Sequence, residues 1–147
     1  MSLEEEIKQE KFKSQHHKAL VNIVYTANMI EQISQRFLRK YGISTQQLNV
    51  LRILREVKPK VATVTLLQRR MLDKMSNASR LVDKLLEKGL VNRVLNKNDR
   101  RKVDVKITAK GMKLLQKIDK TDYQSEFFKL NETEAKKLND LLDKIRG

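Results

Sequence analysis

The sequence predicts a mainly α-helical chain that carries one small β-hairpin. Apolar residues recur at alternating spacings of three and four over both ends of the chain, which is the period of an amphipathic helix. Over residues 103–107, apolar and charged side chains instead alternate strictly, which is the period of a strand. The chain has 147 residues, 39% of them hydrophobic, which suits one domain with a buried core.

Residues 1–43 contain the first predicted helix. Its apolar stripe is interrupted only by Ser34 and consists of Leu20, Ile23, Ala27, Ile30, Ser34, Phe37 and Tyr41. Gly42 is typical of the left-handed residue that ends a helix. A stripe of this length needs a partner surface, either another helix of the same chain or the same helix of a second copy.

A second helix is predicted to begin after Ser44. Ser44 and Gln47 have the spacing of a capping box, in which each side chain accepts the other residue's backbone N–H. Pro59 ends the helix, because proline lacks the N–H that a helix interior needs. The expected buried positions are Leu48, Leu51, Ile53 or Leu54, and Val57.

Residues 61–89 predict two short helices separated by a tight turn. Either Thr63 or Thr65 caps the first, and Asp73 is the expected N-cap of the second, which Gly89 closes. The second helix has an apolar face, and its opposite face is polar and mostly positive. That polar face comprises Lys74, Ser76, Asn77, Ser79, Arg80, Asp83, Lys84 and Lys88.

A hairpin follows these two helices. Its strands are predicted over residues 91–95 and 103–107, with Val103, Val105 and Ile107 on one face. The intervening loop, residues 96–102, has four basic residues, one acidic residue and no apolar one. The loop is therefore expected to project into solvent or onto a charged partner.

The remaining residues predict helices of near-neutral charge. Thr108 is the expected cap of one helix, and Asn131 with Glu134 forms a second capping-box candidate for the last. Met112, Leu114, Leu115 and Ile118 precede Tyr123, Phe127 and Phe128, and Ala135, Leu138, Leu141 or Leu142, and Ile145 follow. Such apolar stripes are typical of an association surface.

The positive charge is concentrated in the middle of the chain. Residues 44–111 hold 17 basic and 6 acidic side chains, a net charge of +11, whereas residues 1–43 carry +2 and residues 112–147 carry +1. Two short helices and a hairpin with a charged tip form the pattern of a winged helix-turn-helix, so the charge predicts binding to a polyanion.

A recognition helix of this kind fits the major groove of duplex DNA. Short polar and planar side chains at its start suit base edges, and these are Ser76, Asn77, Ser79 and Arg80. Lys74, Lys84 and Lys88, with Arg69 and Arg70 of the preceding helix, suit phosphates.

The hairpin tip carries a second DNA-binding candidate, Asp99, Arg100, Arg101 and Lys102. Arginine suits insertion into a narrow minor groove, and a neighbouring carboxylate holds it in the inserting rotamer.

Residues 72–111 contain a distinctive run. It comprises LDKMSNASRLVDKLLEKGLV at residues 72–91, then Arg93, Asn98-Asp99-Arg100-Arg101-Lys102, Val105, Ile107-Thr108 and Gly111. This run resembles the recognition helix and wing of the MarR/SlyA family of bacterial transcription regulators. Ser44-Thr45-Gln46-Gln47-Leu48 likewise resembles the opening of that family's second helix.

The resemblance implies one MarR-like domain over residues 1–147 that acts as a homodimeric repressor or activator, and we expect a repressor at a pseudo-palindromic operator. Residues 1–43 and 112–147 would form the dimer, and residues 44–111 the DNA-binding lobe. Arg101 would reach the minor groove with Asp99 bracing it. The resemblance also implies a small ligand, often aromatic and anionic, between the two lobes, although the sequence identifies no ligand residues.

Two departures from the family pattern stand at Ala62, where relatives have a capping Thr or Ser, and at Met75, in the expected first turn of the recognition helix. The chain has no cysteine, which excludes peroxide sensing through a thiol.

An enzyme is not expected, and neither a cofactor nor a metal. The histidines His16 and His17 are adjacent and point about 100° apart on a helix, and the glycines are scattered singly. The alternative is a winged-helix module that binds RNA or a protein partner without small-molecule control. Residues 44–111 lack Phe, Tyr and Trp, which favours duplex DNA over single-stranded RNA.

The composition also predicts a cellular location. The absence of cysteine favours a reducing compartment. Glu4, Glu5 and Glu6 stand where a secretion signal would be basic, and no stretch reaches about 18 apolar residues. We therefore expect a cytoplasmic protein that does not enter a membrane.

Overall fold

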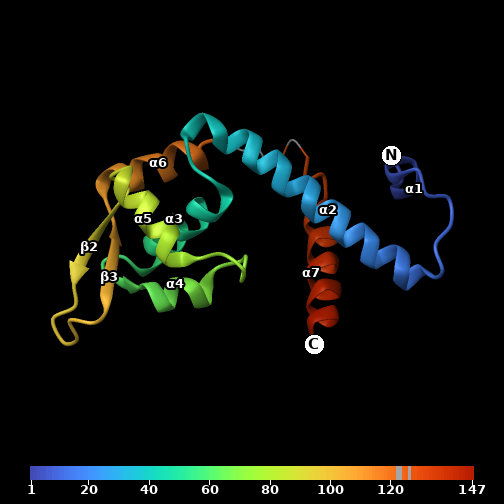
Figure 1. Cartoon of the computed structure of the whole chain (residues 1–147). Helices are drawn as coiled ribbons and strands as arrows, with labels where there is room; N and C mark the ends of the chain where they lie inside the picture. Colours follow the sequence, from blue (N-terminus) through green and yellow to red (C-terminus); the bar gives the residue numbers. More distant parts are fainter. Residues whose placement is uncertain (122–123, 126) are drawn as a thin grey trace. The chain divides into compact units, whose positions relative to one another are not determined.

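The computed structural model describes residues 1–121, 124–125 and 127–147, so the expectation for Tyr123 lies outside the described residues. The chain divides into two compact units, Met1–Leu115 and Gln116–Gly147. Its elements, shown in Figure 1, are α1 (Leu3–Ile7), α2 (Gln15–Leu38), η1 (Arg39–Tyr41), α3 (Thr45–Val57), β1 (Ala62–Thr63), α4 (Val64–Arg70), α5 (Ala78–Glu87), β2 (Val91–Leu95), β3 (Val103–Ile107), α6 (Ala109–Asp119) and α7 (Glu132–Arg146).

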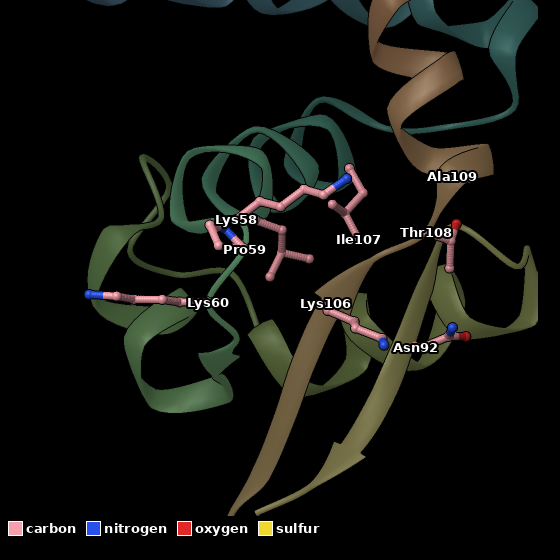
Figure 2. A pocket seen from close by; sticks show the side chains of 9 residues that line it. Lys58, Pro59, Lys60, Asn92, Lys106, Ile107, Thr108 and Ala109 are labelled. Carbon is pink, nitrogen blue, oxygen red and sulfur yellow. The ribbon is translucent and has the colours of Figure 1, made fainter.

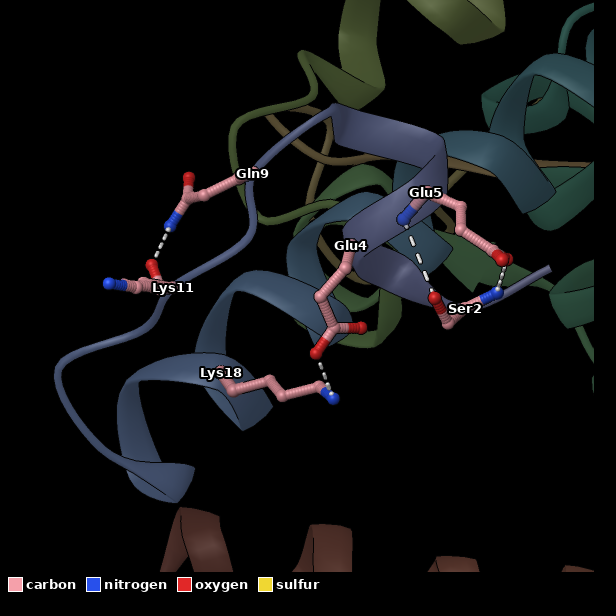
Figure 3. A network of polar contacts seen from close by, with 6 residues as sticks. All are labelled: Ser2, Glu4, Glu5, Gln9, Lys11 and Lys18. Carbon is pink, nitrogen blue, oxygen red and sulfur yellow. Dashed lines mark hydrogen bonds and ion pairs between the residues drawn. The ribbon is translucent and has the colours of Figure 1, made fainter.

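The predicted first helix is α2, and a short helix that the sequence analysis did not predict precedes it. Ser2 and Glu5 form a capping box at the start of α1. The Glu4 carboxylate accepts from Lys18 of α2 at 2.5 Å (Figure 3). The Tyr25 hydroxyl, also on α2, donates to Glu6 at 2.9 Å. These contacts attach α1 to the first half of α2.

Most apolar side chains of α2 are left uncovered by the described residues of the first unit. All its residues are described, and Leu38 alone among them is buried. Leu20 is 61% exposed, and Ile23, Val24 and Met29 are exposed as well. Helix η1 continues from α2 and ends at Gly42, whose φ of 67° is the predicted left-handed stop.

The core of the first unit lies between α3, α4, α5 and the sheet. Ser44 and Gln47 form the predicted capping box of α3. Apolar side chains from each of these elements are fully buried, including Leu51, Leu54, Leu67, Val82, Leu85 and Val105. Of the two threonines proposed as caps for α4, Thr63 accepts the N–H of Leu66 at 3.1 Å.

The sheet has three antiparallel strands in the order β1-β3-β2. The predicted hairpin is β2 and β3, with Val91 opposite Ile107 and Leu95 opposite Val103. Strand β1 was not predicted, because it has two residues and exists only through pairing with β3. Figure 1 shows the hairpin projecting beyond the helices that pack at its base.

The predicted burial pattern of β3 is wrong at its first two residues. Val103 is exposed and Asp104 is buried, whereas Val105 and Ile107 are buried as expected. Asp104 has neighbours on both sides, Thr63 of β1 and Val94 of β2, and its carboxylate accepts from the Asn96 amide at 3.3 Å. The pairing with β1 stops at Asp104, so Val103 has a neighbour on one side only.

Helix α6 begins at the end of β3. Thr108 accepts the N–H of Gly111 at 3.1 Å, as its predicted capping role requires, and its hydroxyl donates to the Gly89 carbonyl at 2.7 Å. A Cβ at Gly111 would lie 2.4 Å from the Leu90 carbonyl oxygen. Only a glycine lets α6 approach the end of the α5–β2 turn this closely.

In the second unit, Asn131 and Glu134 form the predicted capping box of α7. No residue of α7, all of which are described, is buried. Leu141 is 51% and Ile145 67% exposed. Among the helices of the described residues, none combines the length and apolarity needed to cross a membrane.

Candidate nucleic-acid interface

Helix α5 separates its apolar and polar faces sharply. Ala78, Val82 and Leu85 are buried against the core. Ser79, Arg80 and Lys84 lie on the exposed face, as predicted. Asp83 on the same face is paired with Arg93 of β2.

The predicted start of this helix is wrong. Asn77, and not Asp73, is the N-cap of α5, and its Oδ1 accepts the N–H of Arg80 at 3.0 Å. The Asp73 carboxylate instead accepts the Met75 N–H at 2.9 Å and the Ser76 hydroxyl at 3.0 Å. Both residue types are good caps, and here Asp73 stabilises the turn that precedes the helix.

Gln68 of α4 decides between the two starts. Its amide nitrogen donates to the Ser76 carbonyl at 2.8 Å, and its Oε1 accepts the Ala78 N–H at 3.0 Å. Residues up to Ser76 are thereby held in the turn. Sequence reasoning missed Gln68, because a polar residue on a short helix gives no signal of this long-range role.

Because α5 begins after Asn77, two predicted site residues lie before the helix. Lys74 and Ser76 lie in the turn before α5 and not on the helix. The Lys74 ammonium donates to the Arg69 carbonyl at 2.5 Å. Asn77 lies at the helix start, where its side-chain Oδ1 accepts the N–H of Arg80. Met75 likewise precedes the helix and does not stand in its first turn.

The wing loop is shaped by its own polar side chains. Asn96 Oδ1 accepts the N–H groups of Asn98 and Asp99, each at 2.9 Å. Asp99 Oδ1 accepts the backbone N–H of Arg101 at 3.0 Å. Asp99 thus holds the loop backbone, and among the described residues no ion pair joins its carboxylate to Arg100 or Arg101.

Five basic residues of α5 and the wing loop, which we call the basic surface, are Arg80, Lys84, Arg100, Arg101 and Lys102. All five side chains are exposed. None has a carboxylate partner within the part of the chain that the structure describes. Such unneutralised cations suit a polyanion better than a carboxylate-rich protein surface.

The three residues proposed for further phosphate contacts differ in their surroundings. Arg69 is exposed, and Arg70 is paired with Glu56 of α3. The Lys88 ammonium donates to the Gly42 carbonyl and to Gln47 Oε1. Lys88 thus bonds to its own chain at the end of α5.

The unit also holds a pocket of about 390 Å³ where the ends of α3 and β3 meet the start of α6. Lys58, Lys60 and Lys106 line it beside Ile107 and Thr108 (Figure 2). Figure 2 shows Lys60 directed away from the other lining side chains. None of the lining residues, all of which are described, is acidic.

Among the described residues, the acid–base groups with a shifted pKa are Glu4 of α1 and Tyr25 of α2. The hydrogen bond from Lys18 lowers the pKa of Glu4, and the hydrogen bond to Glu6 raises the pKa of Tyr25. His17 packs edge-on against Phe12 with ring centroids 5.7 Å apart. The described residues contain no group of three or more side chains that suits a metal ion.

Comparison with known protein families gives a match in the middle of the chain. The family model described as MarR family matches residues 43–103. No curated protein sequence matches the chain. The MarR transcription factor from Planctomyces limnophilus is 28% identical, with a TM-score of 0.67, over 92% of this chain and 98% of its own.

Two further solved structures share the fold. A MarR-like transcription regulator from Bacillus cereus is 23% identical, with a TM-score of 0.77, over 90% of this chain and 96% of its own. A cysteine-to-serine mutant of MarR from E. coli, solved in complex with operator DNA, is 24% identical, with a TM-score of 0.74, over 99% of both chains.

Proposed function

Since residues 43–103 of this chain match the model of the MarR family and lie in a winged-helix fold, we propose that the protein is a transcription regulator that binds duplex DNA sequence-specifically. The observation that carries this proposal is the basic surface of α5 and the wing, five exposed cations with no carboxylate partner in the described residues. In the proposed complex, α5 enters the major groove and the wing tip follows the adjacent minor groove. This family is one of regulators and not of enzymes, in agreement with the sequence analysis.

The contacts divide into two kinds. Ser79 and Arg80, in the first turn of α5, are the polar side chains best placed to read base edges. Lys84 and Lys102 would bind phosphates, with Lys74 and Arg69 at the preceding turn. Arg100 and Arg101 would enter the minor groove from a loop whose backbone Asn96 and Asp99 hold in place.

The active form is proposed to be a homodimer. Exposed apolar side chains on α2 and α7, such as Val24 and Ile145, support burial against a second copy. Two recognition helices about 34 Å apart would then bind successive major grooves of a pseudo-palindrome. Occupying such a site would block transcription, so the proposed role is repression.

Release by a small anion is supported by the pocket beside α6. Lys58 and Lys106 bring positive charge to a hollow that Leu54, Pro59 and Ile107 make partly apolar. A carboxylate on an apolar ring matches that lining. Benzoate added to the protein–operator complex should release it, and Lys106→Gln should raise the benzoate concentration required, while Lys97→Gln on the wing loop should not.

The test of the main proposal is selection of duplexes from a random pool with the full chain. The expected result is one enriched pseudo-palindrome whose half-sites lie about 10 base pairs apart. Binding to that duplex should fall steeply between about 50 and about 200 mM salt. Failure to enrich any duplex, together with retention of single-stranded RNA, would favour the RNA-binding alternative.

A further inference from the structure

Two large apolar side chains stand in water beside the start of α5. Met75 is 93% exposed and Leu72 is 86% exposed, both in the turn between α4 and α5. Leaving an apolar side chain of this size in water forgoes the free energy that burial would supply. Neither therefore stabilises the fold by packing.

The turn that carries them is held in place by hydrogen bonds. The Leu72 N–H donates to Asn49 of α3 at 2.9 Å, and the Met75 N–H donates to Asp73. Gln68 fixes the carbonyl of the next residue, Ser76, at 2.8 Å. These hydrogen bonds hold the backbone of Met75 in place, three residues before the start of α5.

This point lies where a recognition helix meets base edges. The first residues of such a helix contact the bases. The side-chain Oδ1 of Asn77 already accepts the N–H of Arg80 as the helix cap. The polar readers that remain, Ser79 and Arg80, follow on the helix. Met75 precedes them and adds an apolar surface to the same end.

The charges around Met75 determine which partner suits it. Arg69, Lys74 and Arg80 lie within six residues of Met75 in the sequence, and the carboxylate of Asp73 accepts hydrogen bonds from the Met75 N–H and the Ser76 hydroxyl. An apolar side chain in a basic segment complements the major groove, where phosphates flank base edges. The apolar group on those edges is the C5 methyl of thymine.

We propose that Met75 contacts a thymine methyl group in the major groove and so selects thymine at one position of each half-site. The inference rests on the proposed DNA-binding function. The long, unbranched and polarisable methionine side chain suits a contact with a single methyl group.

The test replaces thymine by deoxyuridine, one position at a time, in the selected operator. The replacement removes only the methyl group and keeps the base pair and its O4 acceptor. Wild-type affinity should fall about fourfold for each substituted half-site at one position, the effect of about one buried methyl group. Met75→Ser should bind the thymine operator about as weakly and should not respond to deoxyuridine there.

Leu72→Ser is the matched control, because it removes the other exposed apolar side chain of the same turn. It should keep the full response to deoxyuridine. The proposal is overturned if Met75→Ser responds as the wild type does, or if Leu72→Ser alone abolishes the response. It is also overturned if deoxyuridine has no effect at any position on an operator that the wild type still selects, a result that leaves the DNA-binding function intact.

Discussion

The winged-helix lobe, residues 44–111, is built differently from the helices α2 and α7. In the lobe, Ser44, Thr63, Asn77 and Thr108 each accept a backbone N–H at a helix start, and α3, α4, α5 and the sheet bury a shared core. In α2 and α7, by contrast, apolar stripes are largely exposed. The lobe buries its apolar side chains within one chain, whereas α2 and α7 leave theirs exposed and available to a partner surface.

The largest effect is expected when charged residues are placed on the exposed apolar face of α2. Leu20→Lys with Val24→Lys should leave the fold intact, because both side chains are already exposed. The added charges should prevent a second copy from packing on this face, so the variant should be a monomer. Loss of the second half-site should lower operator affinity about a hundredfold or more. Light scattering and operator titration measure the two effects.

Asn22→Lys with Thr26→Lys is the control, since it adds the same charge to exposed positions on a different face of α2. It should leave the dimer intact. A dimer that survives the first pair of substitutions would show that α2 is not the interface.

Within the lobe, Gly111→Ala should cause the largest loss of stability. Its Cβ would lie 2.4 Å from a backbone oxygen, which cannot move as a side chain can. We expect the free energy of unfolding to fall by about 3 kcal/mol in urea titration. Gly42→Ala has open space around it and only the left-handed backbone to strain, so it should cost about 1 kcal/mol.

On the basic surface, Arg101→Ala should weaken operator binding about tenfold without changing stability. The loss should be greater at operators whose flanks are rich in A·T pairs, where the minor groove is narrow. Lys97→Ala removes a charge from the same loop and should cost less. Equal losses for the two variants would mean that the loop supplies charge alone.

Asn77→Ala sharpens the assignment of the helix start. Loss of the cap should lower the free energy of unfolding by about 1 kcal/mol, as urea titration measures it. Asn77→Asp keeps an acceptor at the same place and should retain most of that stability. If both variants were equally stable, the start at Asn77 would be wrong.

The smallest effect concerns α1. The Glu4 pKa is lowered by Lys18, so its contribution to docking is present above the ordinary pKa, about 4.3, and is lost as pH falls through the lowered value. The carboxyl carbon chemical shift of Glu4 should therefore stay constant from pH 7 to about 5 and change only below that range. Lys18→Gln should move this change to higher pH, and a transition near neutral pH would contradict the assignment.

Local signals in the sequence predicted most of the fold correctly. The capping boxes at Ser44 and Asn131 and the stop at Gly42 depend on residues within one turn, so spacing alone reveals them. The wing followed from alternation over five residues, together with a loop that has no apolar side chain.

The misses share a dependence on distant residues. Strand β1 exists because β3 is beside it, and α1 is held by Lys18 and Tyr25. Asp73 and Asn77 are equivalent caps to a sequence pattern, and Gln68 of another helix distinguishes them. Composition thus indicated the candidate residues on α5 and the wing, but it placed Lys74 and Ser76 on the helix and not in the turn between α4 and α5.

Lys88 connects three elements of the chain through hydrogen bonds. Its ammonium group binds the carbonyl of Gly42, where η1 ends, and the side chain of Gln47 in α3, while its backbone belongs to the end of α5. These bonds tie the end of η1 and the start of α3 to the end of α5. In a dimer held through α2, Lys88 would thus couple the position of α5 to that of α2, and with it the span between the two half-sites.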